Sequence, residues 1–262
     1  MSDAPVTLAT DTRGVATLTL NRPDVHNAFD DALIAELDRL LAQLTDERAV
    51  RVVVLAAAGR SFCAGADLHW MRRMAAFDEQ QNVEDALRLA RLLRRLDRLP
   101  KPTVARVQGA ALGGGVGLVA CCDIAVAARG AVFALSEVRL GLIPATISPY
   151  LVAAVGARAA RRYVLTGERF GAEEALRIGL VHEVAGDDEL DAAAERIVAA
   201  LLQGGPVSIA AGKELVAHVA ASANDQALLA ETARRIARAR AGDEGREGIA
   251  AFLEKRKPRW IR

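Results

Sequence analysis

The sequence is poor in cysteine, and the few cysteines it has are badly placed for cross-links. Its 262 residues include 3 cysteines, Cys63, Cys121 and Cys122. Their number is odd, two are adjacent, and no CxxC or Cys/His spacing accompanies them, which argues against a disulfide framework and a zinc site. We therefore expect a metal-free protein of a reducing compartment, with Cys121 and Cys122 as small core residues.

Long apolar runs and an excess of charge of one sign are also missing. No apolar run approaches the ~20 residues of a membrane span, and the N-terminal MSDAPVTLATDTRG has neither the basic nor the apolar region of a signal peptide. The formal net charge is +1, which provides no general footprint for nucleic acid. We expect a soluble, cytoplasmic protein that binds neither membranes nor nucleic acid.

Short β-branched runs alternate with longer amphipathic runs over the first two-thirds of the chain. Four of these runs predict strands: 15–20, 50–57, 103–109 and 123–128. The segments between them predict helices, the first capped by Asn27 or Asp30. From the N-cap pair Ser148-Pro149 onward the pattern is helical, apart from a strand at 180–185. The sequence predicts an α/β core with a helical C-terminal region packed on it or on a neighbouring subunit.

Three adjacent glycines at 113–115 give the backbone unusual freedom. The stretch lacks the GxxxxGK[ST] of a phosphate loop, and its GxGxxA match starts too far from the preceding strand for a dinucleotide fingerprint. Glycine also lets a bare backbone N–H approach a ligand at a helix start. GRSFCAGADLHW at 59–70 offers a second small-residue loop after a strand, and two N–H donors aimed at one point form an oxyanion hole.

Taken in order, several motifs resemble the crotonase (enoyl-CoA hydratase/isomerase) superfamily. They are LNRPDVHNAF at 20–29, RSFCAGADL at 60–68, KPTVARVQGAALGGGVGL at 101–118, CDIAVAA at 122–128, FALSEVRLGLIP at 133–144 and LTGERFGAEEALRIGLVHEV at 165–184. The resemblance covers almost the whole chain. It implies a spiral core of repeated ββα units over 1–195, a helical trimerisation region over 196–262, and a homotrimer or a dimer of trimers.

The resemblance implies an acyl-CoA substrate, with coenzyme A as part of the substrate and no separate cofactor. In this family the thioester oxygen lies between two backbone N–H groups, at positions that match Ala66 and Gly114. Those groups hold the oxygen of an enolate, and one such donor is worth about 3 kcal/mol of barrier. Glu137 matches a family glutamate, and its apolar neighbours are expected to raise its pKa toward that of an acid/base at neutral pH.

One family glutamate is replaced by Gly117. A glycine cannot orient water or move a proton, so a mechanism with two carboxylates is in doubt. With Glu137 alone, three reactions remain open: hydration, double-bond isomerisation, and a retro-aldol step after hydration. Of these we expect hydration of the 2,3 double bond of an enoyl-CoA. The rivals are an enoyl-CoA isomerase and a non-catalytic acyl-CoA or RNA-binding protein of the same fold, which the retention of Glu137 disfavours.

The segment IPATISPYL at 143–151 differs from the glycine-rich sequence of many family members. With GGGVGLVACCD it resembles the methylglutaconyl-CoA hydratase subgroup, which hydrates branched glutaconyl-CoA thioesters in leucine or acyclic terpene breakdown. Thr146, Ser148 or Tyr150 could then hydrogen-bond a second carboxylate on the acyl group; alternatively, Thr146 and Ser148 only cap a helix.

The resemblance also implies a set of substrate-binding positions. Gly113 and Gly117 are expected at the acyl group, and Phe252 and Lys255 are expected to reach the CoA of a neighbouring subunit, with Lys255 as a phosphate contact. The remaining CoA contacts are expected from two loops, at Val25, Ala28, Ala64, Asp67 and Leu68.

Overall fold

The computed structural model describes residues 4–261 and contains two β-sheets. The larger sheet has the order β1-β2-β3-β4-β6-β9 and is parallel except for the antiparallel pair β1–β2. Its strands are β1 (Val6–Thr10), β2 (Val15–Leu20), β3 (Val52–Ala57), β4 (Thr103–Val107), β6 (Ile124–Ala128) and β9 (Glu183–Ala185). The smaller sheet consists of β5 (Ala110–Leu112), β7 (Val132–Ala134) and β8 (Arg169–Gly171). The predicted α/β class is confirmed.

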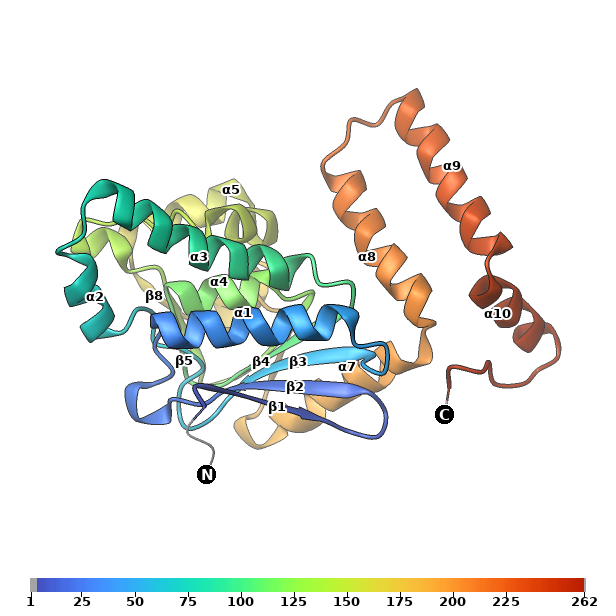
Figure 1. Cartoon of the computed structure of the whole chain (residues 1–262), viewed down its shortest axis with the longest axis horizontal. Coiled ribbons are helices and arrows are strands. Elements are labelled where there is room, and N and C mark those ends of the chain that lie inside the picture. Colours follow the sequence, from blue (N-terminus) through green and yellow to red (C-terminus); the bar gives the residue numbers. More distant parts are fainter. Residues whose placement is uncertain (1–3, 262) are drawn as a thin grey trace.

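Helices cover both faces of the larger sheet (Figure 1). On one face, α1 (Asp31–Asp46) and α4 (Gly114–Cys121) pack on the strands, and α3 (Glu79–Asp97) packs on these two helices. The other face is covered by α7 (Leu190–Gln203), which packs on β3, β4, β6 and β9. All residues of β3 are buried, as expected for a central parallel strand with helices on both sides.

Helix α1 is capped by Asp30, whose side chain accepts a hydrogen bond from the Leu33 N–H. Asn27, the other candidate cap, is instead fully buried, and its side-chain amide donates to the Ala58 and Ser61 carbonyls. At the second predicted helix start, Ser148 is the first helical residue and Ile147 the N-cap. The prediction that Ser148 is the N-cap is therefore wrong, because its hydroxyl donates backward to the Ala145 carbonyl.

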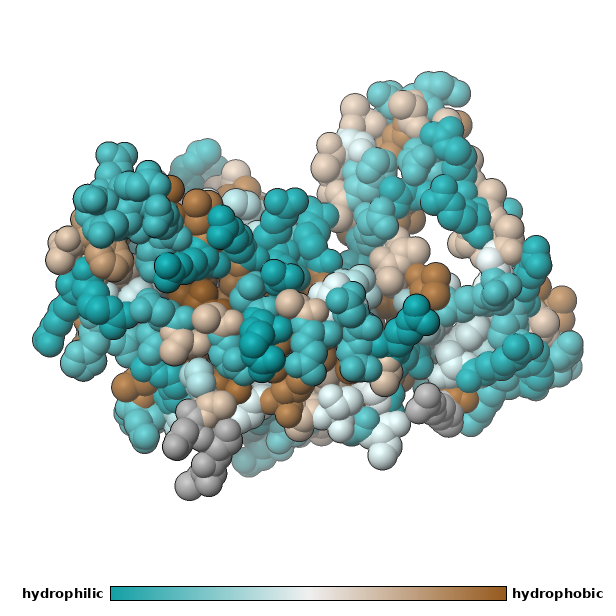
Figure 2. Space-filling view, in the orientation of Figure 1, coloured by the Kyte–Doolittle hydropathy of each residue, from teal (hydrophilic) through white to brown (hydrophobic). Residues whose placement is uncertain are grey.

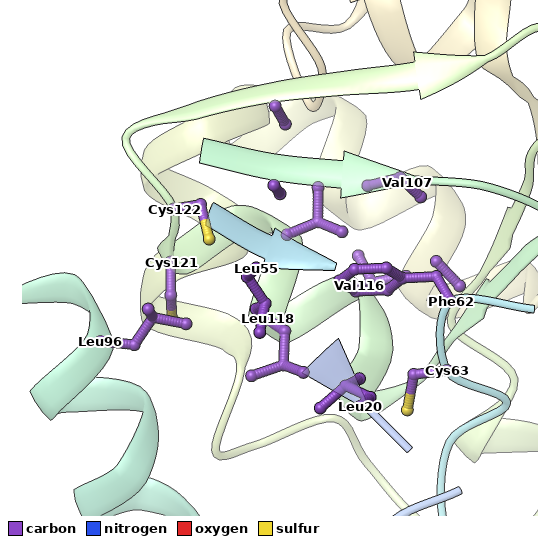
Figure 3. Packing of buried hydrophobic residues seen from close by; sticks show 14 of the residues in the cluster. Leu20, Leu55, Phe62, Cys63, Leu96, Val107, Val116, Leu118, Cys121 and Cys122 are labelled. Atoms are coloured by element: carbon purple, nitrogen blue, oxygen red, sulfur yellow. The ribbon is translucent and has the colours of Figure 1, made fainter. Parts of the chain in front are cut away.

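The remaining elements of the core are short or peripheral. They are α2 (Leu68–Met74), α5 (Ser148–Thr166), α6 (Ala172–Arg177) and the 3-10 helices η1 (Pro23–Val25), η2 (Glu137–Leu140) and η3 (Asp187–Glu189). Figure 3 shows Leu55, Val107 and Leu118 among the apolar side chains between the sheet and α4. Cys121 and Cys122 are free and buried there, and burial raises the pKa of Cys122 to about 12. Both are core residues, as predicted.

The last three helices project from the core as a C-terminal arm, residues 206–253 (Figure 1). The arm consists of α8 (Pro206–Ala220), α9 (Gln226–Ala241) and α10 (Asp243–Leu253). The expected boundary after residue 195 falls inside α7, which stays with the core because Val198 is buried against strands β2, β3 and β4. The change in packing comes at Gly204 and Gly205, directly before α8.

Polar contacts tie the arm and the segment that follows it back to the core. Lys213 of α8 lies 2.8 Å from Asp123 Oδ2, and the Trp260 indole N–H donates to the Gln203 carbonyl at 2.9 Å. Apolar side chains nevertheless remain exposed along the arm, among them Val207, Val216 and Phe252, and Figure 2 shows hydrophobic surface interleaved with hydrophilic surface there. Among the helices of residues 4–261, none combines the length and the hydropathy that a bilayer span requires.

Candidate active site

The loop that carries Ala66 lies between β5 and the segment around Phe29, and it pairs with each of them through an isolated β-bridge. On one side Cys63 forms a parallel bridge with Ala111 of β5. On the other side Phe29 bridges Ala66, since the Phe29 N–H donates to the Gly65 carbonyl at 2.7 Å and the Asp67 N–H donates to the Phe29 carbonyl at 2.8 Å. In this pattern the N–H of Ala66 itself points away from Phe29. It has no acceptor within residues 4–261.

The glycine run places a second free N–H at the start of α4. Gly113 has φ +51°, a left-handed conformation that favours glycine, and its N–H donates to the Ala134 carbonyl. Gly114 is the first residue of the helix, so its N–H has no intrahelical acceptor and lies at the positive end of the helix dipole. A Cβ on Gly114 would lie 2.7 Å from the Phe29 ring, so this close approach requires glycine.

The structure brings together the three residues predicted to be catalytic. A Cβ built on Gly113 would lie 2.9 Å from Glu137 Oε1 and 4.0 Å from the Cα of Gly65. Gly65 precedes Ala66, and Gly113 precedes Gly114. The two free N–H groups and the Glu137 carboxylate therefore belong to one small cluster, which joins the 60–67 loop, the start of α4 and η2.

Glu137 is held without a polar partner on one of its oxygens. Its Oε2 is buried and makes no hydrogen bond within residues 4–261. Burial raises the pKa of this carboxyl, and a hydrogen bond with its own backbone opposes the shift. Buried polar atoms are normally paired, so an unpaired carboxylate oxygen beside two unpaired N–H groups is the arrangement of a site that awaits a ligand.

The position of the missing second carboxylate is filled by Ile147. A Cβ added to Gly117 would lie 2.3 Å from Ile147 Cγ2, closer than carbon atoms approach. Gly117 was predicted to line the acyl site, but its own surface is buried under Ile147. The sequence pattern did not single out Ile147, because nothing in an apolar residue before a helix indicates which helix it covers.

The polar residues of the 143–151 segment do not all face the cluster. The Ser148 hydroxyl is used within its own turn. Burial raises the pKa of the Tyr150 phenol, and the nearby thiol of Cys121 and carboxyl of Asp97 act in the same direction. Those neighbours lie where α3 and α4 end, so Tyr150 points away from the Glu137 end of α4. Thr146 is half-buried, and its hydroxyl makes no hydrogen bond within the described residues.

The two loops predicted to hold CoA lie side by side. The Ala64 N–H donates to the His26 carbonyl at 3.0 Å, which joins the loop with Val25 and Ala28 to the loop with Ala64. Ala28 is buried, Ala64 is half-buried, and Val25 is exposed. Leu68 is 71% exposed, an apolar side chain open to solvent at the rim of this surface.

Asp67 and Arg22 stiffen these loops. The Asp67 side chain accepts hydrogen bonds from the His69 and Trp70 N–H groups and caps α2. Burial would raise its pKa, but these N–H groups and Arg22 lower it overall. Arg22, which the sequence pattern did not single out, contacts Asp67 and Asp30 and donates to the Ala28 carbonyl at 2.7 Å. The Asp67 carboxylate is thus used in contacts within the protein, so a ligand could contact Asp67 only through its backbone.

Phe252 and Lys255 lie at the end of the arm, on α10 and just after it. Phe252 is 83% exposed, and Lys255 has φ +53°. In Figure 1 α10 lies at the opposite end of the molecule from α2, and α10 packs on α8 and α9. Within one subunit these residues do not reach the Glu137 cluster, so their predicted role requires a second subunit.

Comparisons with known proteins show which family and fold the chain resembles. A model of the enoyl-CoA hydratase/isomerase family matches residues 10–262. The crystal structure of an enoyl-CoA hydratase from Shewanella pealeana is 48% identical, with a TM-score of 0.95 over 98% of this chain and 96% of that one. The mevalonyl-coenzyme A hydratase sidH of Aspergillus fumigatus is 38% identical over 93% of this chain and 90% of its own length. The short-chain-enoyl-CoA hydratase of Clostridium acetobutylicum is 33% identical over 93% and 92%. The expected crotonase-type fold is confirmed.

Proposed function

The chain belongs to the enoyl-CoA hydratase/isomerase family, and from this premise we propose that it is a hydratase that adds water across the 2,3 double bond of an enoyl-CoA. The observation that carries the proposal is the buried, unpaired Oε2 of Glu137 beside the free N–H groups of Ala66 and Gly114. A carboxylate and two donors are the groups that a hydration through a thioester enolate needs.

The two N–H groups hold the thioester oxygen. As C3 is attacked, the electrons of the double bond move toward the thioester carbonyl, and its oxygen gains negative charge. The N–H groups of Ala66 and Gly114 and the positive end of the α4 dipole stabilise that charge more than the neutral ground state. Each donor contributes about 3 kcal/mol to lowering the barrier.

Glu137 moves the proton. Its carboxylate accepts a proton from a water molecule while the water oxygen forms its bond to C3. The protonated Glu137 then donates that proton to C2 of the enolate, which restores the carboxylate and the thioester carbonyl. Both new bonds form on the face of the double bond that Glu137 occupies, so the addition is syn. One carboxylate completes the cycle, in agreement with a glycine at position 117.

For the acyl group we propose a branched glutaconyl thioester. Support comes from the resemblance of the 143–151 segment and from the half-buried Thr146, whose hydroxyl is available to a second carboxylate. Tyr150 offers no such support, since it points toward the far end of α4.

For the assembly we propose a homotrimer, alone or paired into a hexamer. The exposed apolar side chains of the arm support a subunit contact, and Phe252 and Lys255 lie where they could reach a neighbour but not their own site.

Mass spectrometry of small acyl-CoAs incubated with the purified protein tests the reaction. The panel contains crotonyl-CoA, 3-methylglutaconyl-CoA, a 3-enoyl-CoA and feruloyl-CoA. We expect the 2-enoyl substrates to gain the mass of one water, most readily the glutaconyl thioester, and the Glu137→Gln variant to give no gain. An unchanged mass with a shifted double bond would identify an isomerase instead. If none of the acyl-CoAs reacts, the result favours a protein that binds acyl-CoA without catalysing hydration or isomerisation.

A further inference from the structure

Phe29 contacts both segments that carry the oxyanion donors. Its backbone pairs with the 60–67 loop through the bridge to Ala66, and its ring packs on Gly114 at the start of α4. The ring atoms Cε2 and Cδ2 lie 2.7 and 2.9 Å from the position that a Cβ on Gly114 would take. The side chain is 1% exposed, so the surrounding protein encloses the ring. Phe29 thus meets one donor segment through its backbone and the other through its side chain.

The backbone of Phe29 is fixed by the residues on either side of it in the sequence. Asn27 is fully buried in a left-handed conformation, with φ +55°, and its side-chain amide donates to two backbone carbonyls outside its own turn. Asp30, directly after Phe29, is the N-cap of α1. These contacts do not involve the ring. A smaller side chain at position 29 should therefore keep the backbone bridge to Ala66 and change the contact with Gly114.

We propose that Phe29 is a positioning residue that sets the separation and direction of the two oxyanion donors. The proposal rests on the proposed function, in which the N–H groups of Ala66 and Gly114 bind one thioester oxygen. The hydrogen bonds of Phe29 to the residues flanking Ala66 fix the direction of the first N–H, and the ring limits how far Gly114 can move toward Phe29. Both donors must lie within hydrogen-bond distance of the oxyanion to stabilise it, so Phe29 acts on the chemical step through them.

The variant Phe29→Leu tests this role through the rate of hydration. Leucine is apolar but lacks Cε2, the ring atom nearest to the Cβ position of Gly114, so the start of α4 can shift toward residue 29. Because a misplacement of about 1 Å can cost about 10²-fold in rate, we expect a smaller shift to lower kcat with crotonyl-CoA about 10-fold. The Kd of butyryl-CoA, measured by calorimetry, should change little.

The thioester carbonyl reports the two donors without turnover. Butyryl-CoA is saturated and cannot be hydrated, and an isotopic label on its carbonyl carbon identifies the stretching band of the bound thioester by infrared difference spectroscopy. In the wild type this frequency should be lower than in solution, because two N–H groups and the α4 dipole polarise the bond. In Phe29→Leu about half of that lowering should be lost, since one of the two donors moves out of place.

A matched control separates this effect from a general loss of core packing. Phe170 is a buried phenylalanine whose ring lies against those of Phe133 and Tyr163. Phe170→Leu makes the same truncation there and should change neither kcat nor the carbonyl band. If Phe29→Leu does not fold, Phe29→Met keeps more of the buried volume and carries the same test.

A double variant tests the contact between the ring and α4 directly. In Gly114→Ala the new Cβ collides with Cε2 of Phe29, and Phe29→Leu removes that atom. Substitutions of residues in contact are not additive, so Phe29→Leu/Gly114→Ala should turn over about 10-fold faster than Gly114→Ala alone. Hydration kinetics of the two single variants and the double variant measure this coupling.

The proposal is overturned if the carbonyl band of Phe29→Leu matches that of the wild type, if Phe170→Leu shifts the band equally, or if the losses in the double variant simply add. Its failure is distinguishable from failure of the proposed hydration. A wild type that hydrates no enoyl-CoA, but whose lowered carbonyl frequency is partly lost in Phe29→Leu, refutes hydration and retains the positioning role. Hydration by the wild type with an unchanged band in Phe29→Leu refutes the positioning role alone.

Discussion

The core and the C-terminal arm bury their apolar side chains in different ways. In the core, helices and strands enclose a continuous cluster of apolar residues that extends from Val6 to Val181. In the arm, within the part of the chain that the structure describes, Ala251 is the one fully buried apolar side chain. Burial of apolar surface is the main source of folding stability. The core can therefore hold a site by itself, whereas the arm needs another surface to cover it.

This difference assigns separate tasks to the two regions. In the proposed hydration, the core supplies the two oxyanion donors and Glu137. The arm supplies exposed residues, Phe252 and Lys255, that lie far from the site of their own subunit. Changes in the core should affect the chemical step, and changes in the arm should affect binding, assembly or stability.

The largest effect should come from Glu137→Gln in the core. The amide keeps the size of the side chain but cannot accept the proton of water, so kcat should fall by about 10³-fold while the Kd of a saturated acyl-CoA changes little. Steady-state hydration kinetics and calorimetry measure the two quantities. A variant that retains wild-type turnover would place the base elsewhere.

Gly114→Ala should cost about 10²-fold in kcat. Its Cβ would lie 2.7 Å from the ring of the buried Phe29, so the backbone must shift and move an oxyanion donor out of place. Gly212→Ala in the arm is the matched control, because a Cβ there meets nothing within 4 Å. Equal kinetics for the two variants would contradict the importance of backbone placement at Gly114.

Replacing both Phe252 and Lys255 by alanine should weaken acyl-CoA binding about tenfold, a loss of about 1.4 kcal/mol, and leave kcat nearly unchanged. Calorimetry with butyryl-CoA measures the change. Lys257→Ala removes a charge from the same exposed segment and serves as the control. Unchanged affinity in the double variant would remove the arm from the CoA site.

Lys213→Ala tests how firmly the arm is tied to the core. Its ion pair with Asp123 is half-buried, so its loss should destabilise the protein by about 1 kcal/mol and lower Tm by about 2–4 °C. The pair of Arg129 and Glu173 is largely exposed, and Arg129→Ala should leave Tm unchanged. An equal decrease in Tm for Arg129→Ala and Lys213→Ala would contradict this prediction.

The smallest effect should be a pH-dependent gain in stability in Glu137→Gln. Burial raises the pKa of Glu137 in the folded state above its unfolded value. The favourable contribution of the protonated group is therefore present below the unfolded pKa and is lost as the pH rises through the folded pKa. At neutral pH the glutamine variant should unfold at higher denaturant concentration than the wild type, and the difference should vanish in acid. A difference that persists in acid would exclude the titration of Glu137 as its cause.

The elements predicted from sequence were those with a periodic pattern of their own. Strand β2 was predicted with its observed ends, and β3, β4 and β6 were predicted with ends that differ by one or two residues. The strands of the smaller sheet are 3 residues long and were not predicted. A strand of that length has no readable alternation, and its pairing partners lie far away in the sequence.

By itself, the sequence determined the α/β class, the position of the glycine run and the presence of a glutamate among apolar residues. Local propensity, backbone freedom and apolar patterning act over a few residues and can be read from them. Only the tertiary structure decided that Asp30 rather than Asn27 caps α1, that Tyr150 points away from Glu137, and that Ile147 covers Gly117. Each of these depends on which distant segments pack together, and packing forces a choice that a single segment leaves open.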